Sequence, residues 1–142
     1  MTVYLLDINL LLALADPNHT HHSRAHDWFG REDGRAWATC PGTENGFVRI
    51  ASHPKYPNRP GDASTVLEQL RQMCRGPGHR FWADSVSLRS GLGSEAAFTH
   101  HAVTDLYLLT LAVENQAKLA TFDRKIPAAI VAGGAEAIEL LT

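Results

Sequence analysis

The chain has 142 residues, of which 44% are hydrophobic, and a formal net charge of −2. This length suits a single domain over residues 1–142, and the composition excludes a disordered chain. Two cysteines, Cys40 and Cys74, make neither a disulfide framework nor a zinc pattern, so we expect reduced thiols in a cytoplasmic protein.

In the first half of the chain, short β-prone runs alternate with longer amphipathic stretches. The predicted elements are a strand at residues 3–6, a helix at 8–15, a helix at 20–29 capped by Thr20, a strand at 36–39, a helix at 41–52, a loop at 53–61 and a helix at 63–75. The sequence Asp16-Pro17-Asn18 is expected to end the first helix. That helix is too short to span a bilayer, so we expect no membrane association.

The second half continues the alternation. The predicted elements are a strand in the first half of residues 81–88, a loop at 90–93, a short helix at 94–98, a helix at 104–115 capped by Thr104, a strand at 118–121, a short helix at 126–131 and a strand at 137–140. Such alternation is typical of an α/β domain with three layers, in which helices flank a mostly parallel central sheet.

Four acidic residues lie just after predicted strands or at the starts of predicted helices. Asp7 and Asp123 follow predicted strands, whereas Glu44 and Asp105 lie in the first turns of predicted helices. Ligands of open parallel sheets bind beyond the carboxyl ends of the strands, where all four acids would lie. Each acid also has a simpler explanation, because an acid can cap a helix or stabilise its dipole.

Apolar residues flank Asp7 on both sides in the sequence, so we expect its carboxylate to be buried. A buried carboxylate is costly without a partner, and no Lys or Arg lies within ten residues of it. A divalent cation is therefore a reasonable partner, and oxygen ligands favour Mg²⁺ or Mn²⁺ over zinc. The spacing of His22 and His26 leaves a transition-metal site open, although a polar start of a helix explains both residues as well.

The charge of the chain is distributed unevenly. Residues 49–80 hold six basic and two acidic side chains, a local charge of +4, whereas the remainder carries −6. Arg49, Lys55 and Arg59 are the foremost candidates to position RNA over the acids. A solvated helix and loop would give the same pattern, particularly at Arg71 and Arg75.

Four segments resemble, in order, the acidic motifs of the PIN-domain family. They are Leu5-Leu6-Asp7-Ile8-Asn9-Leu10-Leu11, Thr43-Glu44-Asn45-Gly46-Phe47-Val48-Arg49, Val103-Thr104-Asp105-Leu106-Tyr107-Leu108-Leu109 and Leu119-Ala120-Thr121-Phe122-Asp123. The second is particularly similar to that of VapC-type toxins of bacterial toxin–antitoxin systems. Each motif is short, but the ordered set spans residues 5–123.

The resemblance implies a Mg²⁺-dependent endoribonuclease that cleaves structured RNA, forms a homodimer and is silenced by a VapB-type antitoxin. By position, the catalytic acids would be Asp7, Glu44, Asp105 and Asp123. Of these, Asp7, Asp105 and Asp123 would hold the metal, and Asn9 and Thr121 would be supporting polar groups. Residues 53–100 match no motif, so the target RNA stays open.

Two other functions fit the same residues. One is a metal-dependent DNA nuclease or phosphatase on the same scaffold. The other is a PIN-like module that binds RNA and blocks translation with little cleavage. The chain lacks the second Asp of a haloacid-dehalogenase-type phosphatase and any glycine-rich phosphate loop.

Overall fold

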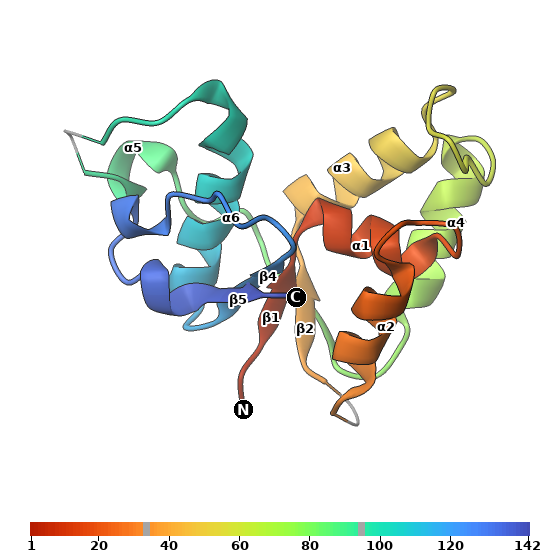
Figure 1. Ribbon diagram of the computed structural model, residues 1–142, viewed down its shortest axis with the longest axis horizontal. Coiled ribbons are helices and arrows are strands. Elements are labelled where there is room, and N and C mark those ends of the chain that lie inside the picture. Colours follow the sequence, from red (N-terminus) through yellow and green to blue (C-terminus); the bar gives the residue numbers. More distant parts are fainter. Residues whose placement is uncertain (33–34, 94–95) are drawn as a thin grey trace.

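A five-stranded sheet forms the centre of the computed structural model, which describes residues 1–32, 35–93 and 96–142 (Figure 1). Its strands are β1 (Tyr4–Leu6), β2 (Trp37–Thr39), β3 (His79–Phe81), β4 (Lys118–Thr121) and β5 (Ile138–Leu140). The strands lie in the order β3-β2-β1-β4-β5, and each neighbouring pair is parallel. The predicted parallel sheet is therefore confirmed, and the carboxyl ends of β1, β2 and β4 meet at one edge.

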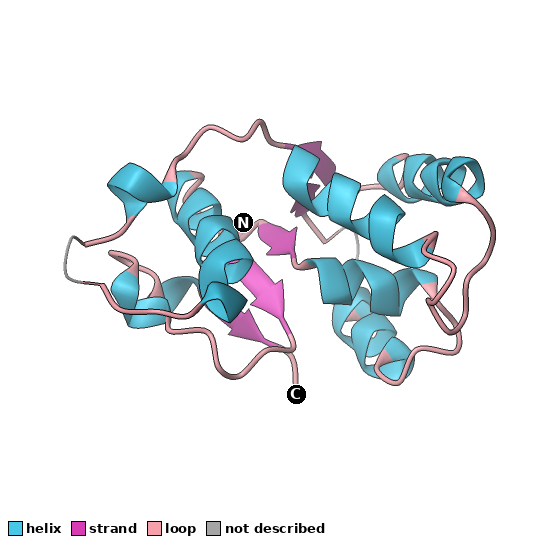
Figure 2. Cartoon of the chain, turned by 90° about the horizontal axis from the view of Figure 1, so that it is seen from above, coloured by secondary structure: helices cyan, strands magenta, loops and turns pink. Residues whose placement is uncertain are grey.

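Helices cover both faces of the sheet and complete three layers (Figures 1 and 2). One face carries α1 (Ile8–Ala15), α2 (His22–Gly30), α3 (Pro41–Ala51) and α4 (Ala63–Cys74). The other carries α5 (Leu88–Gly91), α6 (Val103–Glu114) and the 3-10 turns His100–Ala102, Ala128–Ile130 and Ala135–Ala137. Within the described ranges, no helix is both long and apolar enough to cross a membrane.

Strand β1 is buried on both faces, which fixes its position at the centre of the molecule. Successive side chains of a strand point to opposite faces. Leu6 accordingly belongs to the core beneath α1–α4, together with Leu10 and Phe47, whereas Leu5 belongs to the core beneath α6, together with Leu106. All five side chains are fully buried. The two cores hold the end of β1, and therefore Asp7, in a fixed place.

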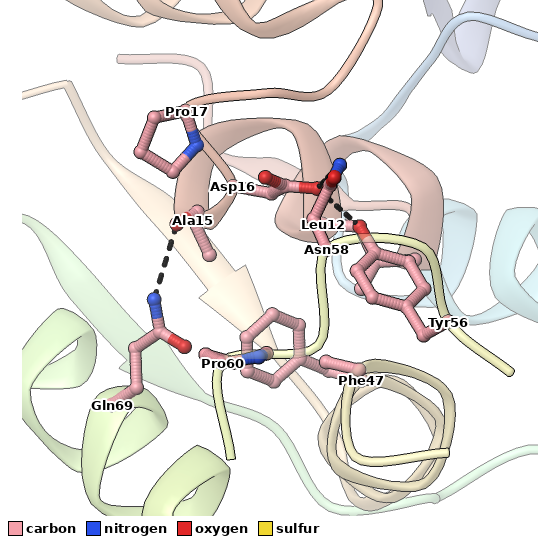
Figure 3. Close-up of a pocket in the computed structure, with 10 residues that line it drawn as sticks. Leu12, Ala15, Asp16, Pro17, Phe47, Tyr56, Asn58, Pro60 and Gln69 are labelled. Atoms are coloured by element: carbon pink, nitrogen blue, oxygen red, sulfur yellow. Dashed lines mark hydrogen bonds between the residues drawn. The ribbon is translucent and has the colours of Figure 1, made fainter. Parts of the chain in front are cut away.

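The first helix has a polar residue at each end, as the sequence predicts. The carboxylate of Asp7 caps its start, and Asp16 follows its last residue. Asp16 accepts hydrogen bonds from the Tyr56 hydroxyl at 2.7 Å and from Asn58 Nδ2 at 2.8 Å, and Gln69 donates to the Ala15 carbonyl (Figure 3). These contacts attach the segment after α3, and α4 itself, to the end of α1.

Two predicted helix caps are wrong. Helix α2 begins at His22, and its cap position is taken by His21 without a side-chain hydrogen bond, so Thr20 lies outside the helix. Helix α6 continues directly from the turn His100–Ala102 and begins at Val103, which places Thr104 inside it. In both cases a preceding turn supplies the helix start that the sequence pattern predicts at a threonine.

The segment between α4 and α6 departs most from the prediction. β3 begins at His79 because His79–Phe81 pairs with Trp37–Thr39, so the strand expected within 81–88 shares only its first residue. α5 occupies part of the loop expected at 90–93. In the helix expected at 94–98, residues 96–98 are not helical, and residues 94–95 lie outside the described residues. The helix expected at 126–131 is a single 3-10 turn after Pro127.

Candidate active site

Asp7 lies at the junction of β1 and α1 and is only 6% exposed. Its Oδ1 accepts a hydrogen bond from the Asn9 backbone N–H at 3.1 Å, and its Oδ2 accepts one from the Thr121 hydroxyl at 2.6 Å. Burial raises the pKa of this carboxyl, and the charge of Asp123 adds to the increase, although both hydrogen bonds oppose it. A carboxylate here is costly without a positive partner.

Thr121 connects the ends of two neighbouring strands. It is the last residue of β4, which pairs with β1, and its side chain is fully buried. Its hydroxyl donates to Asp7 Oδ2 and accepts the Asp123 backbone N–H at 3.0 Å. The same hydroxyl therefore fixes the Asp7 carboxylate and the backbone that carries Asp123.

Asp105 brings a third carboxylate to this place from the opposite side of the sheet. It lies in the first turn of α6 and is half-buried. Burial raises its pKa to about 7, and the charges of Asp7 and Asp123 contribute to the increase. Three elements that are distant in sequence thus hold three carboxylates close together, and the pKa values of Asp7 and Asp105 are raised by their acidic neighbours. A divalent cation would relieve this repulsion, and an all-oxygen set of donors suits Mg²⁺ or Mn²⁺.

Glu44 lies elsewhere. It extends from the first turn of α3, and its Oε2 accepts a hydrogen bond from the Thr39 hydroxyl at 2.7 Å. Candidate ligand atoms of Glu44, Cys74 and His79 all lie within 4.8 Å of one another. The structure thus brings Asp7, Asp105 and Asp123 together and directs Glu44 toward α4 and β3.

Asn9 lies between Asp7 and an open groove. Its backbone N–H binds Asp7, and its exposed side chain borders the groove together with Asp123, His21 and Phe122. The His21 and Phe122 rings stack with centroids 4.6 Å apart. Asn9 can therefore reach a ligand that enters this groove.

Five of the six basic residues of the middle segment divide into two groups. Arg49 and Lys55 are exposed, and together they border a second groove, at the end of α3. Arg59 follows on the same segment and donates to the Ser52 carbonyl at 2.8 Å. Arg71 and Arg75, in contrast, lie 3.3 and 3.7 Å from the carboxylate of Glu68. Glu68 of α4 thus offsets one of the two positive charges, and both arginines lie on the solvated face that the sequence left open for them.

The paired histidines of α2 have a structural role. His22 Nδ1 lies 2.7 Å from the Ala13 carbonyl and His26 Nε2 lies 2.8 Å from the Leu14 carbonyl. Both imidazoles thus engage carbonyls at the end of α1, which explains the i, i+4 spacing without a metal. Metal-binding side chains also approach one another at Glu44, Cys74 and His79, and the sequence analysis missed Cys74 and His79. Their separation of five residues was the available signal, and only the pairing of β2 with β3 brings Glu44 to them.

Curated ribonucleases of Mycobacterium tuberculosis are similar to this chain over most of its length. Ribonuclease VapC38 is 46% identical over 122 residues, which cover 84% of each protein. Ribonuclease VapC44 is 39% identical over 131 residues, 91% of this chain and 92% of the relative. Ribonuclease VapC39 is 38% identical over 136 residues, 94% of this chain and 98% of the relative. This chain belongs to the VapC family of PIN-domain toxins.

Solved structures agree with this VapC-family membership at the level of the fold. The crystal structure of VapC20 from Mycobacterium tuberculosis, a Sarcin-Ricin loop cleaving toxin, matches with a TM-score of 0.62 and 13% identity over 91% of this chain and 96% of that one. VapBC2 from Rickettsia felis, bound to a DNA fragment from its promoter, matches with a TM-score of 0.60 and 12% identity over 99% and 100%. No family model matches the chain. The predicted PIN-like fold and the resemblance to VapC toxins are confirmed.

Proposed function

We propose that this VapC-family chain is a Mg²⁺-dependent endoribonuclease toxin, with Mn²⁺ as a possible substitute. The observation that carries the proposal is the convergence of Asp7, Asp105 and Asp123, whose burial and mutual repulsion raise two of their pKa values. The names of the curated relatives support a ribonuclease, and the carboxylates support the metal dependence.

The side chains of this chain would divide the work as follows. Asp7, Asp105 and Asp123 would hold the ion, and a bound ion would lower the pKa of a water and offset the growing negative charge of the phosphodiester. Asp105 must release its proton to take part, because its pKa of about 7 leaves it partly protonated near neutral pH. Thr121 keeps Asp7 in place during this exchange. The products would be a 5′-phosphate and a 3′-hydroxyl.

Glu44 and Asn9 remain proposed members of the site. Asn9 would contact RNA or the ion from the exposed side of the carboxylates. Glu44 would complete the ion's shell or orient the attacking water, which requires its carboxylate to leave Thr39 and turn toward Asp7. The catalytic role of Glu44 therefore depends on a movement of its side chain.

RNA would be held by the exposed basic side chains beyond α3. Arg49 and Lys55 support this proposal because they border one groove and have no acidic partner among the salt bridges of the described residues. Arg59 lies on the same segment. Phosphate contacts of this kind give affinity without sequence preference, so they leave the choice of target to the shape of the RNA.

The assembly follows from family membership. We infer a VapB-type antitoxin partner, which the VapBC2 structure of Rickettsia felis supports. A homodimer and a cytoplasmic location remain proposals that rest on the family resemblance. The antitoxin would bury apolar surface of the toxin and place an Arg or Lys beside the carboxylates, since a guanidinium can pair with a carboxylate in a bidentate manner. Co-expression with the neighbouring small gene product should form a complex and relieve toxicity.

Sequencing of RNA ends after expression tests the proposal and separates it from the two rivals. Wild type should produce new 5′-phosphate ends at defined positions, and Asp7→Asn should produce none. Arrested translation without new ends would favour an RNA-binding module. Cleavage of single-stranded DNA but not RNA by the purified protein would favour a DNA nuclease.

A further inference from the structure

A second group of metal-binding side chains lies apart from the three aspartates. Glu44 comes from the first turn of α3, Cys74 is the last residue of α4, and His79 is the first residue of β3. Candidate ligand atoms of all three lie within 4.8 Å of one another, and each residue is partly buried. A bound ion could therefore be reached from solvent and still be held by three separate elements.

Thr39 orients two of these three side chains. Its buried hydroxyl donates to Glu44 Oε2 at 2.7 Å and lies 2.8 Å from His79 Nε2. Around metal sites, such outer hydrogen bonds fix the orientation of the ligands and raise the affinity for the ion. The strand pairing of Trp37–Thr39 with His79–Phe81 makes this arrangement part of the sheet.

The donor set differs in chemistry from that of the three aspartates. A thiolate, an imidazole and a carboxylate select Zn²⁺ and similar ions, whereas Mg²⁺ prefers oxygen alone. Ligands of a tetrahedral zinc ion lie roughly 3.3–3.6 Å apart, given metal–ligand bonds of about 2.0–2.3 Å. Movements of about an ångström would therefore suffice for three atoms already within 4.8 Å.

We propose that Glu44, Cys74 and His79 form a binding site for a thiophilic divalent cation of the Zn²⁺ class, with water completing the coordination. Binding releases the proton of the Cys74 thiol, because a thiol ligates zinc as the thiolate. The ion also holds Glu44 where it lies in this structure. If Glu44 serves in RNA cleavage, which rests on the proposed function, Zn²⁺ at this site inhibits the enzyme by withholding that carboxylate.

Cobalt(II) spectroscopy tests the site without any need for catalysis. Co²⁺ added to the full chain should give a thiolate-to-cobalt charge-transfer band in the near ultraviolet, which Zn²⁺ abolishes by displacement. The band should disappear in Cys74→Ser and weaken in His79→Gln, and it should survive in Cys40→Ala, which removes the only other thiol. Thr39→Val should weaken Co²⁺ binding about 10- to 100-fold.

Two results would overturn the site. One is a folded wild-type protein without the band, which would leave only a hydrogen-bonded network around Thr39. The other is a band that survives in Cys74→Ser or is lost in Cys40→Ala.

Activity gives a separate test of the consequence for Glu44. Low Zn²⁺ in the presence of excess Mg²⁺ should slow RNA cleavage by wild type but not by Cys74→Ser. If the cobalt band behaves as expected and Zn²⁺ leaves cleavage unchanged, the link to Glu44 is wrong and the site stands. If no variant or wild type cleaves RNA, the proposed function fails while the cobalt result is unaffected.

Discussion

The ionisation of Asp105 depends on its burial and on the charges of its neighbours. Its folded pKa is about 7 because of burial and the charges of Asp7 and Asp123, whereas its ordinary value is 3.8. Between these two values the folded protein keeps a proton that the unfolded chain has lost. The stability of the metal-free protein should therefore fall as the pH rises from about 4 to 7.

The substitution Asp105→Asn removes this cost. In EDTA at pH 8, we expect the variant to be more stable than wild type by roughly 1–2 kcal/mol, a value reduced for the partial exposure of the group. The gain should shrink toward zero only as the pH falls well below 3.8, where the wild-type carboxyl is neutral in both states. Urea unfolding across this pH range measures the difference. A gain that is independent of pH would contradict the assigned repulsion.

Thr121 gives the second prediction at this scale. Thr121→Val keeps the volume of the side chain but removes the hydroxyl that joins Asp7 to the Asp123 backbone. We expect a decrease of about 1–3 kcal/mol in stability and a 10- to 100-fold weaker affinity for Mg²⁺, measured by calorimetry.

Thr110→Val is the matched control for Thr121→Val. Thr110 is also a buried threonine, but its hydroxyl binds the Leu106 carbonyl within α6. Thr110→Val should therefore reduce stability without changing the affinity for Mg²⁺. Equal affinities for Mg²⁺ in the two variants would mean that the Thr121 hydroxyl has no part in metal binding.

At the scale of elements, the contacts of Asp16 explain how the segment after α3 is held. Burial raises the pKa of this carboxyl, but the hydrogen bonds from Asn58 and Tyr56 outweigh it and lower the pKa below the ordinary value. Tyr56→Phe should reduce the free energy of unfolding by about 1 kcal/mol at pH 7. The reduction should diminish as the pH falls through the depressed pKa of Asp16, because protonation weakens the same bond in wild type. A reduction that persists in acid would point to packing of the Tyr56 ring instead.

The sequence predicts the bounds of some elements and not of others. Helix α1 and strand β4 have the predicted bounds. The apolar stretch of α1, interrupted only by Asn9, ends at Asp16, and the apolar pair of β4, Leu119 and Ala120, lies between two polar residues. β3 does not have the predicted bounds, because His79 and Arg80 have no apolar pattern and become a strand only by pairing with β2. The caps at Thr20 and Thr104 failed for a similar reason, since turns formed by neighbouring residues start those helices.

At the scale of the whole molecule, the open question is how a chain of net charge −2 holds RNA beside three carboxylates. In an Asp7→Asn background, Lys55→Ala with Arg59→Ala should weaken RNA binding and lower the slope of log affinity against log salt. The slope should fall by about 0.7–0.9 for each phosphate that the protein no longer neutralises. The control pair Arg71→Ala and Arg75→Ala should change the slope less, because Glu68 lies beside both arginines and offsets one of their two positive charges. If both pairs of substitutions lowered the slope equally, Lys55 and Arg59 would have no specific role in holding RNA, and only a general electrostatic attraction would remain.

The site itself could be predicted in part. The ends of β1 and β4 and the start of α6 converge by the rules of parallel sheets, so the positions of Asp7, Asp123 and Asp105 followed from the sequence. The orientation of Glu44 did not, because it depends on the hydrogen bond to Thr39 and on the approach of β3. Side-chain direction within the first turn of a helix is a tertiary property that spacing alone does not determine.

The central claim is that Asp7, Asp105 and Asp123 hold the divalent ion on which RNA cleavage depends. The most direct measurement is the rate of RNA cleavage by purified wild type and Asp105→Asn as Mg²⁺ is titrated after EDTA treatment, with folding checked by circular dichroism. We predict that wild type has no activity until Mg²⁺ is added and that Asp105→Asn, though folded and more stable, is at least about a hundredfold slower at every Mg²⁺ concentration. A folded Asp105→Asn that matches the wild-type rate, or a wild type that cleaves equally well in EDTA, would contradict the claim.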